Sequence, residues 1–173
     1  GLGDVYKRQV DGECFYTRCA GYDIRLHVPE GYTVAASGDE TEASPGLWRI
    51  RAERMRDATI IISDELDAIR GEAGGITVNS YYARGGESHR RQGEQSLQIA
   101  LKALEAFADA YGPYPYAELD VVESNYEFGG MEAPGLVRIS MLYAMMLDSD
   151  YEEDRVDYAG SLRGTVAHEV AHE

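Results

Sequence analysis

The sequence predicts an α+β protein in which a strand-rich first part precedes a part that mixes helices with strands. Two patterns predict this class. Up to about residue 81, short apolar segments alternate with turns rich in Gly, Pro and Ser, without a helical period. From residue 87, helical patterns flank short strands. We therefore expect a partial β-sandwich or saddle-shaped domain over residues 10–80 and a mixed domain over residues 81–173.

The strand-rich part begins with a clear alternation. Tyr22, Ile24 and Leu26 share one face of residues 22–28, with polar residues between them, as expected of a half-buried strand. The isoleucines at residues 60–62 form a continuous apolar run and predict a strand that is covered on both faces. The strands predicted in this part are 22–28, 32–36, 47–55, 57–63 and 76–83.

The second part contains helical periods. Leu97, Leu101 and Leu104 recur at spacings of three and four, and the pattern stops at a Gly-Pro pair, so we predict a helix over residues 87–111. A last helix begins within residues 151–161 and continues to the end of the chain. Between the two helices the sequence predicts strands at 119–122 and 136–140, a Gly-rich loop at 125–135 and a short helix or coil at 141–147.

Charge and composition exclude several classes of partner. The 173 residues include 31 acids and 16 bases, which give a formal net charge of -15. Such a chain is a poor electrostatic partner for nucleic acid or for an anionic membrane surface. No apolar run approaches the roughly 20 residues that span a bilayer. We expect no nucleic-acid partner and no transmembrane segment, and the sequence leaves the oligomeric state and the compartment open.

Both ends of the chain carry features that we interpret as artificial. Residues 1–9 resemble translated adapter sequence and are set aside, with a natural N-terminal arm as the alternative. The final helical pattern reaches Glu173 without a Gly, a Pro or a basic last turn, so we expect the chain to be a fragment. Cys14 and Cys19 either close a small disulfide loop in an exported protein or are two reduced thiols.

The last residues carry the pattern His-Glu-x-x-His on a predicted helix. His168 and His172 lie about 40° apart on one face, because each residue turns a helix by about 100°. Two imidazoles at this spacing suit zinc, which binds histidine nitrogens at about 2.0–2.1 Å. Glu169 lies one position round the helix, where it can take a proton from a zinc-bound water. The opposite face carries the aliphatic residues Leu162, Val166 and Val170. The alternative is a chance match on a solvated surface helix.

A second motif lies upstream, in the predicted Gly-rich loop. It reads Gly129-Gly130-Met131-Glu132 and is followed by Ala133. Together with the His-Glu-x-x-His helix, it resembles the gluzincin aminopeptidases, the family of aminopeptidase N, in which a Gly-x-Met-Glu-Asn segment precedes that helix. Ala133 stands where the family has Asn and lacks its side-chain amide. The resemblance extends over most of the chain after the first strand.

The resemblance implies a fold, a cofactor and a catalytic base. Residues 81–173 would be the front half of a thermolysin-like zinc-peptidase domain, preceded by the back half of the family's β-domain. His168 and His172 would bind one zinc ion, and Glu169 would act as the base. The family's third zinc ligand, a Glu on the following helix, and a Tyr that stabilises the tetrahedral intermediate are absent from this chain.

The resemblance also implies how a peptide substrate binds. Glu132 would hold the free α-ammonium of the substrate, which makes such an enzyme an exopeptidase. Gly129, Gly130 and Met131 would form the neighbouring edge, where glycines permit close approach of a peptide backbone. The alternative for Glu132 is a loop carboxylate that caps backbone amides.

Three functions follow from these motifs. The first is a zinc-dependent aminopeptidase, with the chain as given expected to be inactive. The second is a thermolysin-like endopeptidase, which needs no anchor for an α-amine. The third is a non-catalytic scaffold of the same fold, and the retained motif of His168, Glu169 and His172 argues against it.

Overall fold

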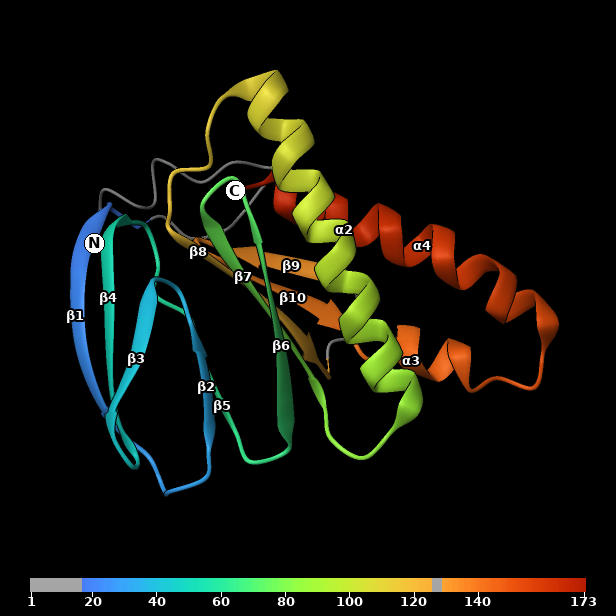
Figure 1. The fold of residues 1–173 in the computed structure, drawn as a ribbon, viewed down its shortest axis with the longest axis horizontal. Helices are drawn as coiled ribbons and strands as arrows, with labels where there is room; N and C mark the ends of the chain where they lie inside the picture. The colour runs from blue at the N-terminus through green and yellow to red at the C-terminus, as the bar shows by residue number, and fades with distance from the viewer. Residues whose placement is uncertain (1–16, 126–128) are drawn as a thin grey trace, which may run out of the picture.

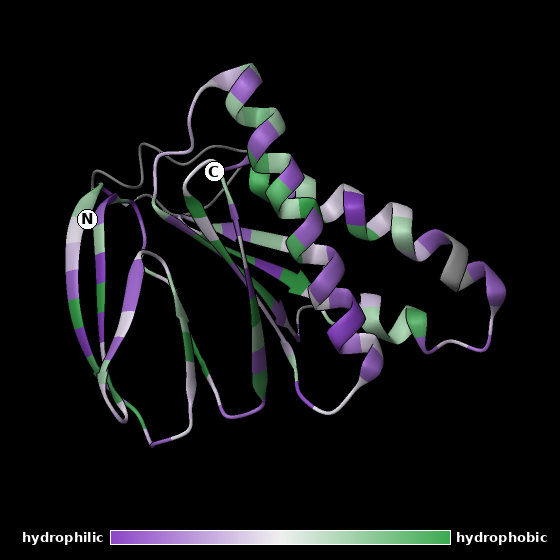
Figure 2. Cartoon of the chain, in the orientation of Figure 1, coloured by the Kyte–Doolittle hydropathy of each residue, from purple (hydrophilic) through white to green (hydrophobic). Residues whose placement is uncertain are grey.

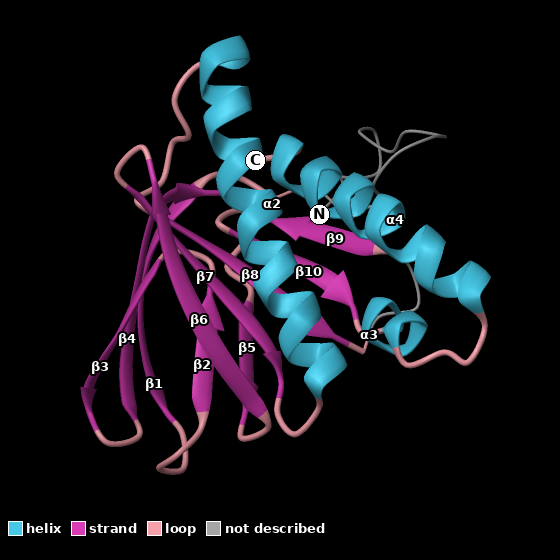
Figure 3. Cartoon of the chain, turned by 45° about the vertical axis from the view of Figure 1, so that its right-hand side comes forward, coloured by secondary structure: helices cyan, strands magenta, loops and turns pink. Residues whose placement is uncertain are grey.

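The computed structural model describes residues 17–125 and 129–173, and this part of the chain has an α+β fold (Figure 1). Strands fill its first half, and the long helices follow. Figure 3 shows the helices on one side of the larger sheet and the strand-rich part on its other side. The predicted α+β class is confirmed. Cys14 and residues 1–9 lie outside the described residues.

Two small antiparallel sheets make up the strand-rich part. One has the strand order β1-β4-β3, and the other pairs β2 with β5. Figure 2 shows hydrophilic and hydrophobic residues alternating along β4, as the sequence predicts for a half-buried strand. The bounds are β1 (Ala20–His27), β2 (Thr33–Ala36), β3 (Asp39–Ser44), β4 (Leu47–Met55) and β5 (Ile60–Ser63).

A mixed five-stranded sheet follows, in the order β6-β7-β8-β10-β9. The pairs β7–β8 and β8–β10 are parallel, and the two outer pairs are antiparallel. The predicted division at residues 80–81 falls inside β7. The bounds are β6 (Leu66–Ala73), β7 (Ile76–Ala83), β8 (Glu118–Ser124), β9 (Gly130–Ala133) and β10 (Leu136–Ser140).

Helices cover one face of this sheet and form the main core with it. They are α2 (Glu87–Tyr111), α3 (Leu142–Leu147) and α4 (Glu152–Ala171). Their apolar faces pack on sheet residues such as Val121 and Val137, whereas Val122 and Leu136 face the strand-rich part. None of the described helices is long and apolar enough to cross a membrane. The alternating faces of β8 and β10 therefore join the helical layer to the strand-rich layer.

Four sequence predictions are corrected. The predictions omitted β3, whose burial pattern is almost entirely exposed, and β6, in which small and charged residues mask the alternation. Residues 130–133 are strand β9 and not part of a loop, because Gly130 and Ala133 give little apolar signal. The run at residues 60–62 is not covered on both faces, since Ile62 is 41% exposed in the two-stranded sheet.

Three carboxyl groups meet where the strand-rich part contacts the larger sheet. Oxygens of Glu40 on β3 and of Glu118 and Asp120 on β8 lie within 4.8 Å of one another. Asp120 is fully buried and accepts a hydrogen bond from the backbone of Ala36 at 3.0 Å. The hydroxyl of Tyr81 donates to Glu40 at 3.1 Å. Burial, and then the neighbouring Asp120 and Glu118, raise the pKa of Glu40 far above its usual range.

Glu40→Gln is expected to weaken the loss of stability at alkaline pH. Because the pKa of Glu40 is raised in the folded state, its stabilising contribution is complete below the ordinary pKa of 4.5 and falls as pH rises toward the raised value. Glutamine keeps the shape without ionising. Thermal unfolding from about pH 5 to about pH 9 should show Glu40→Gln less destabilised than the parent by about 1–3 kcal/mol at the alkaline end. The exposed Glu53→Gln should follow the parent, and an identical profile for Glu40→Gln would contradict the prediction.

Candidate metal centre

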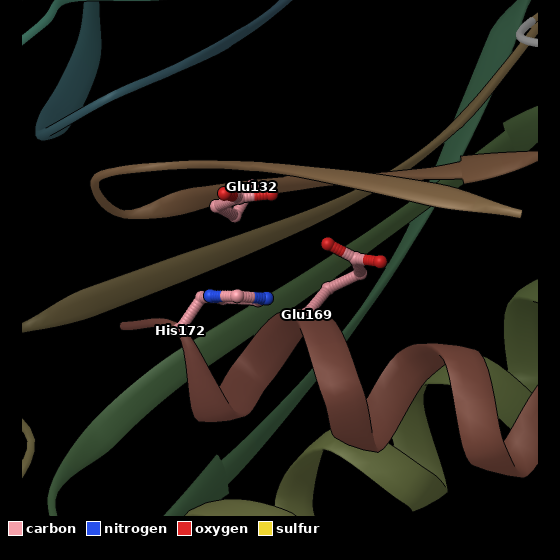
Figure 4. Close-up of side chains that lie close together, drawn as sticks. All are labelled: Glu132, Glu169 and His172. Atoms are coloured by element: carbon pink, nitrogen blue, oxygen red, sulfur yellow. The ribbon is translucent and has the colours of Figure 1, made fainter. Parts of the chain in front are cut away.

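Helix α4 exposes the face that carries the histidines of the His-Glu-x-x-His motif, because its opposite, aliphatic face is buried. Leu162 and Val166 have no exposed surface and Val170 is 4% exposed, in the core shared with α2 and the sheet. Burying three aliphatic side chains contributes about 1.5–3 kcal/mol each, which fixes the rotation of the helix. Both histidines are consequently exposed, as the sequence predicts. Helix α4 contacts β9, and Figure 4 shows His172 at the end of the helix beside this strand.

The two histidines of the motif converge. Their Nε2 atoms are 3.0 Å apart and both side chains are exposed. Two nitrogens bound tetrahedrally at about 2.0–2.1 Å from one zinc ion lie about 3.3 Å apart, close to the distance between His168 and His172. The paired imidazoles therefore fit two positions of one zinc ion, and the donor type is one that zinc prefers.

Two carboxylates lie beside the histidines. Glu169 is 6% exposed, and its carboxylate, that of Glu132 and a ring nitrogen of His172 lie within 4.8 Å of one another (Figure 4). Burial raises the pKa of Glu169, the charge of Glu132 raises it further, and the two histidines act in the opposite direction. A carboxyl whose pKa is moved toward neutrality is suited to taking up a proton and giving it back.

Gly130 is the reason that Glu169 fits under β9. A Cβ at this position would lie 2.5 Å from Oε1 and 2.6 Å from Cγ of Glu169, closer than real Cβ atoms come. A Cβ at Gly129 would instead lie 3.0 Å from the hydroxyl of Tyr143 and 3.2 Å from that of Thr165. The two glycines thus have different neighbours, and only Gly130 leaves room for the candidate base.

The register of β9 separates the remaining motif residues. Glu132 is opposite Val137, which faces the helical core, and so Glu132 lies on the side of α4. Met131 is opposite Arg138 and lies on the other face of the sheet. The structure therefore brings Glu132 to Glu169 and His172, whereas Met131 lines the adjoining cleft. Tyr126 to Phe128, upstream of the motif, are outside the described residues.

A cleft of about 790 Å³ adjoins His172. Its walls are the end of α4, the β9–β10 turn and the end of β4. Glu132 and His172 line it, and Arg54, Arg56 and Arg138 line it from the strand-rich side and the sheet. Cys19 is exposed at its border. The cleft gives an extended ligand access to the histidine side of α4.

Glu173 is a site residue that the sequence predictions did not single out. Its carboxylate accepts a hydrogen bond from the backbone of Gly135 at 2.8 Å, whereas the hydroxyl of the nearby Tyr114 donates to the backbone carbonyl of Glu118. Burial raises the pKa of Glu173 to about 7. The bond to Gly135 fastens the end of α4 to the β9–β10 turn, which holds the two motifs together. No sequence pattern distinguishes this acid from a solvated one after the helix.

Comparison with known proteins adds nothing to these observations. No protein-family model and no curated protein matches the chain. The function must therefore be inferred from the geometry of the site and from its two motifs.

The zinc affinity of the 173-residue chain is expected to be weak and to depend on both histidines. The chain supplies two imidazoles, whereas tight zinc sites in proteins have three or four protein ligands. His172→Ala should lower the affinity by more than about tenfold. Equilibrium dialysis against zinc measures this, with the exposed His27→Ala on β1 as the matched control. Tight stoichiometric binding that survives His172→Ala would place the metal elsewhere.

Proposed function

We propose that this protein is a zinc-dependent peptidase that removes N-terminal residues from peptides. One observation carries the proposal: the carboxylates of Glu132 and Glu169 and the imidazole of His172 meet within 4.8 Å, although they come from a strand and a helix far apart in the sequence. A chance His-Glu-x-x-His on a surface helix gives no reason for a second carboxylate to approach its face. An aminopeptidase needs such an acid beside the metal, because it must bind a free α-ammonium.

The chain's own residues divide the chemistry among them. Zinc held by His168 and His172 would supply an acidified water, with a pKa of about 7, and would polarise the peptide carbonyl. Glu169 accepts the proton of the attacking water and donates it to the leaving amine. Glu132 pairs with the α-ammonium and so places the first peptide bond next to Glu169.

Strand β9 offers a backbone edge for the substrate. It is the last strand in the order β6-β7-β8-β10-β9, and no described strand pairs with its outer edge. A peptide can add to such an edge through main-chain hydrogen bonds, independently of its sequence. A mixed sheet whose antiparallel edge strand lies beside the motif helix also supports the finer proposal of a thermolysin-like domain.

The test compares free and blocked substrates with the protein encoded by the complete gene. We expect release of the N-terminal residue from free peptides and none from N-acetylated ones, with loss of activity on chelation and recovery with zinc. Cleavage of internal bonds in acetylated peptides would indicate an endopeptidase. Bound zinc without cleavage of any peptide would indicate the scaffold.

Glu132→Ala should damage cleavage of free N-terminal substrates far more than zinc content. Removing one partner of a desolvated ion pair lowers kcat/KM by about 30-fold or more. The measurement is kcat/KM on an aminoacyl-naphthylamide, together with zinc content by atomic absorption. Glu72→Ala is the control, because Glu72 is an exposed acid on β6 and does not line the cleft. Unchanged kinetics in Glu132→Ala would reduce Glu132 to a structural carboxylate.

A further inference from the structure

The end of β4 contains an irregularity that changes where its side chains point. In the pairing of β1 with β4, Tyr22 is opposite Ala52, but Ala20 is opposite Met55, so β4 has one extra residue. Arg54 has a φ of 55°, the one described non-glycine residue with a positive value. Such a bulge redirects the strand, and strained backbone of this kind is enriched at functional sites.

The bulge places two arginines at the cleft. Met55 is 2% exposed and anchors the strand, while Arg54 and Arg56 on either side of it line the cleft that Glu132 and His172 border. Without the extra residue, the strict alternation of a strand would put residue 54 on the buried face with Ala52. Because of the bulge, the side chains at the end of β4 line the cleft.

These arginines differ from others in the chain. Arg49, Arg84 and Arg90 form ion pairs with Asp23, Asp67 and Glu94. Neither Arg54 nor Arg56 forms an ion pair with another described residue. In a chain with a net charge of -15, two arginines without an ion pair to a described residue at one cleft can attract a negatively charged ligand.

The carboxylates of the cleft do not cancel this charge. Asp57, Glu132 and Glu173 also line it. Glu132 is assigned to the substrate's ammonium, and Glu173 accepts the backbone hydrogen bond of Gly135. Asp57 is the remaining acid. On the strand-rich side of the cleft, Arg54 and Arg56 outnumber it. The wall opposite α4 is therefore basic overall.

We infer that Arg54 and Arg56 recognise a carboxylate on the side chain of the substrate's N-terminal residue, so that the enzyme prefers N-terminal Asp or Glu. The inference rests on the proposed function. The cleft is bordered by Glu132, which anchors the N-terminus, and by His172 beside the bond to be cut, and Arg54 and Arg56 line it as well. It therefore extends toward the side chain of the first residue. Guanidinium groups match carboxylates in geometry and charge.

The experiment uses the protein encoded by the complete gene and three reporter amides, those of Glu, Ala and Lys, which lack a C-terminal carboxylate. The parent should have a higher kcat/KM for the Glu reporter than for the Lys reporter. Arg54→Gly keeps the positive φ of the bulge and removes the guanidinium. Combined with Arg56→Gln, it should lower the Glu-to-Ala ratio of kcat/KM by about 2- to 30-fold, the range expected for two solvent-exposed ion pairs.

The controls separate the inference from the function on which it rests. Arg51→Gln removes an exposed arginine of the same strand that lines a different groove, and it should leave the Glu-to-Ala ratio unchanged. If the double variant turns over the reporters with the parental Glu-to-Ala ratio of kcat/KM, the inference is wrong but the proposed function stands. The inference is also overturned if the double variant loses only the preference for a dipeptide over the corresponding dipeptide amide. In that case the arginines would recognise the C-terminal carboxylate of the substrate. Zinc-loaded protein that cleaves no reporter overturns the proposed function and this inference together.

Discussion

Glu169→Gln should lower turnover by about 10²- to 10⁴-fold in the protein encoded by the complete gene, the range for general-base assistance. The carboxylate is 6% exposed and lies beside Glu132 and His172, so no bulk water can readily replace it as the proton acceptor. Glutamine has nearly the same shape and can still accept a hydrogen bond, but it cannot take the proton. Fold and zinc content should therefore be preserved, which steady-state kinetics with metal analysis and thermal unfolding can establish.

Two comparisons make this result specific to the base. Glu153→Gln changes an exposed acid on the same helix and should retain parental turnover. The acidic limb of the pH–rate profile should report the protonation of the base, and Glu169→Gln should abolish that limb. Near-parental turnover of Glu169→Gln with zinc bound would show that another group activates the water.

The long helices were predictable because their signals are local. The bounds of α2 coincide with the predicted 87–111, since its leucine period and the following Gly-Pro pair are both within the segment. Strand β6 escaped prediction because its small residues make contacts that only the packed fold reveals. At Gly71, a Cβ would lie 2.9 Å from Leu101 of α2, so the glycine is needed for close packing of the helix on the sheet. In the sequence, the same glycine weakens a strand pattern.

The candidate site also has features that follow from local sequence and features that only the packed fold reveals. The convergence of His168 and His172 follows from helix geometry alone, and the structure has their nitrogens 3.0 Å apart. The approach of Glu132 depends on the register of β9, which the composition of a Gly-rich segment does not specify; it was predicted only through the resemblance. The bond from Gly135 to Glu173 joins residues distant in sequence, and no pattern contains it.

Gly130→Ala should lower turnover by about 10²-fold while the fold and the zinc remain, because a displacement of about 1 Å in a catalytic group costs about that factor. The added Cβ would lie 2.5–2.7 Å from Oε1, Cγ and Cδ of Glu169, and the flexible end of that side chain is the part that can yield. Thermal stability should consequently change little. Kinetics, metal content and unfolding of the same preparation test the three expectations.

Gly129→Ala is the matched control, and its effect should be the reverse. Its Cβ would press on the hydroxyls of Tyr143 and Thr165, which are hydrogen-bonded to each other between α3 and α4. It should therefore reduce stability more than turnover. If Gly130 acts through Glu169, adding Gly130→Ala to Glu169→Gln should cause little further loss, because the base is already gone. Fully additive losses in that double variant would mean that Gly130 affects catalysis by shaping the substrate edge of β9, and not by making room for the base.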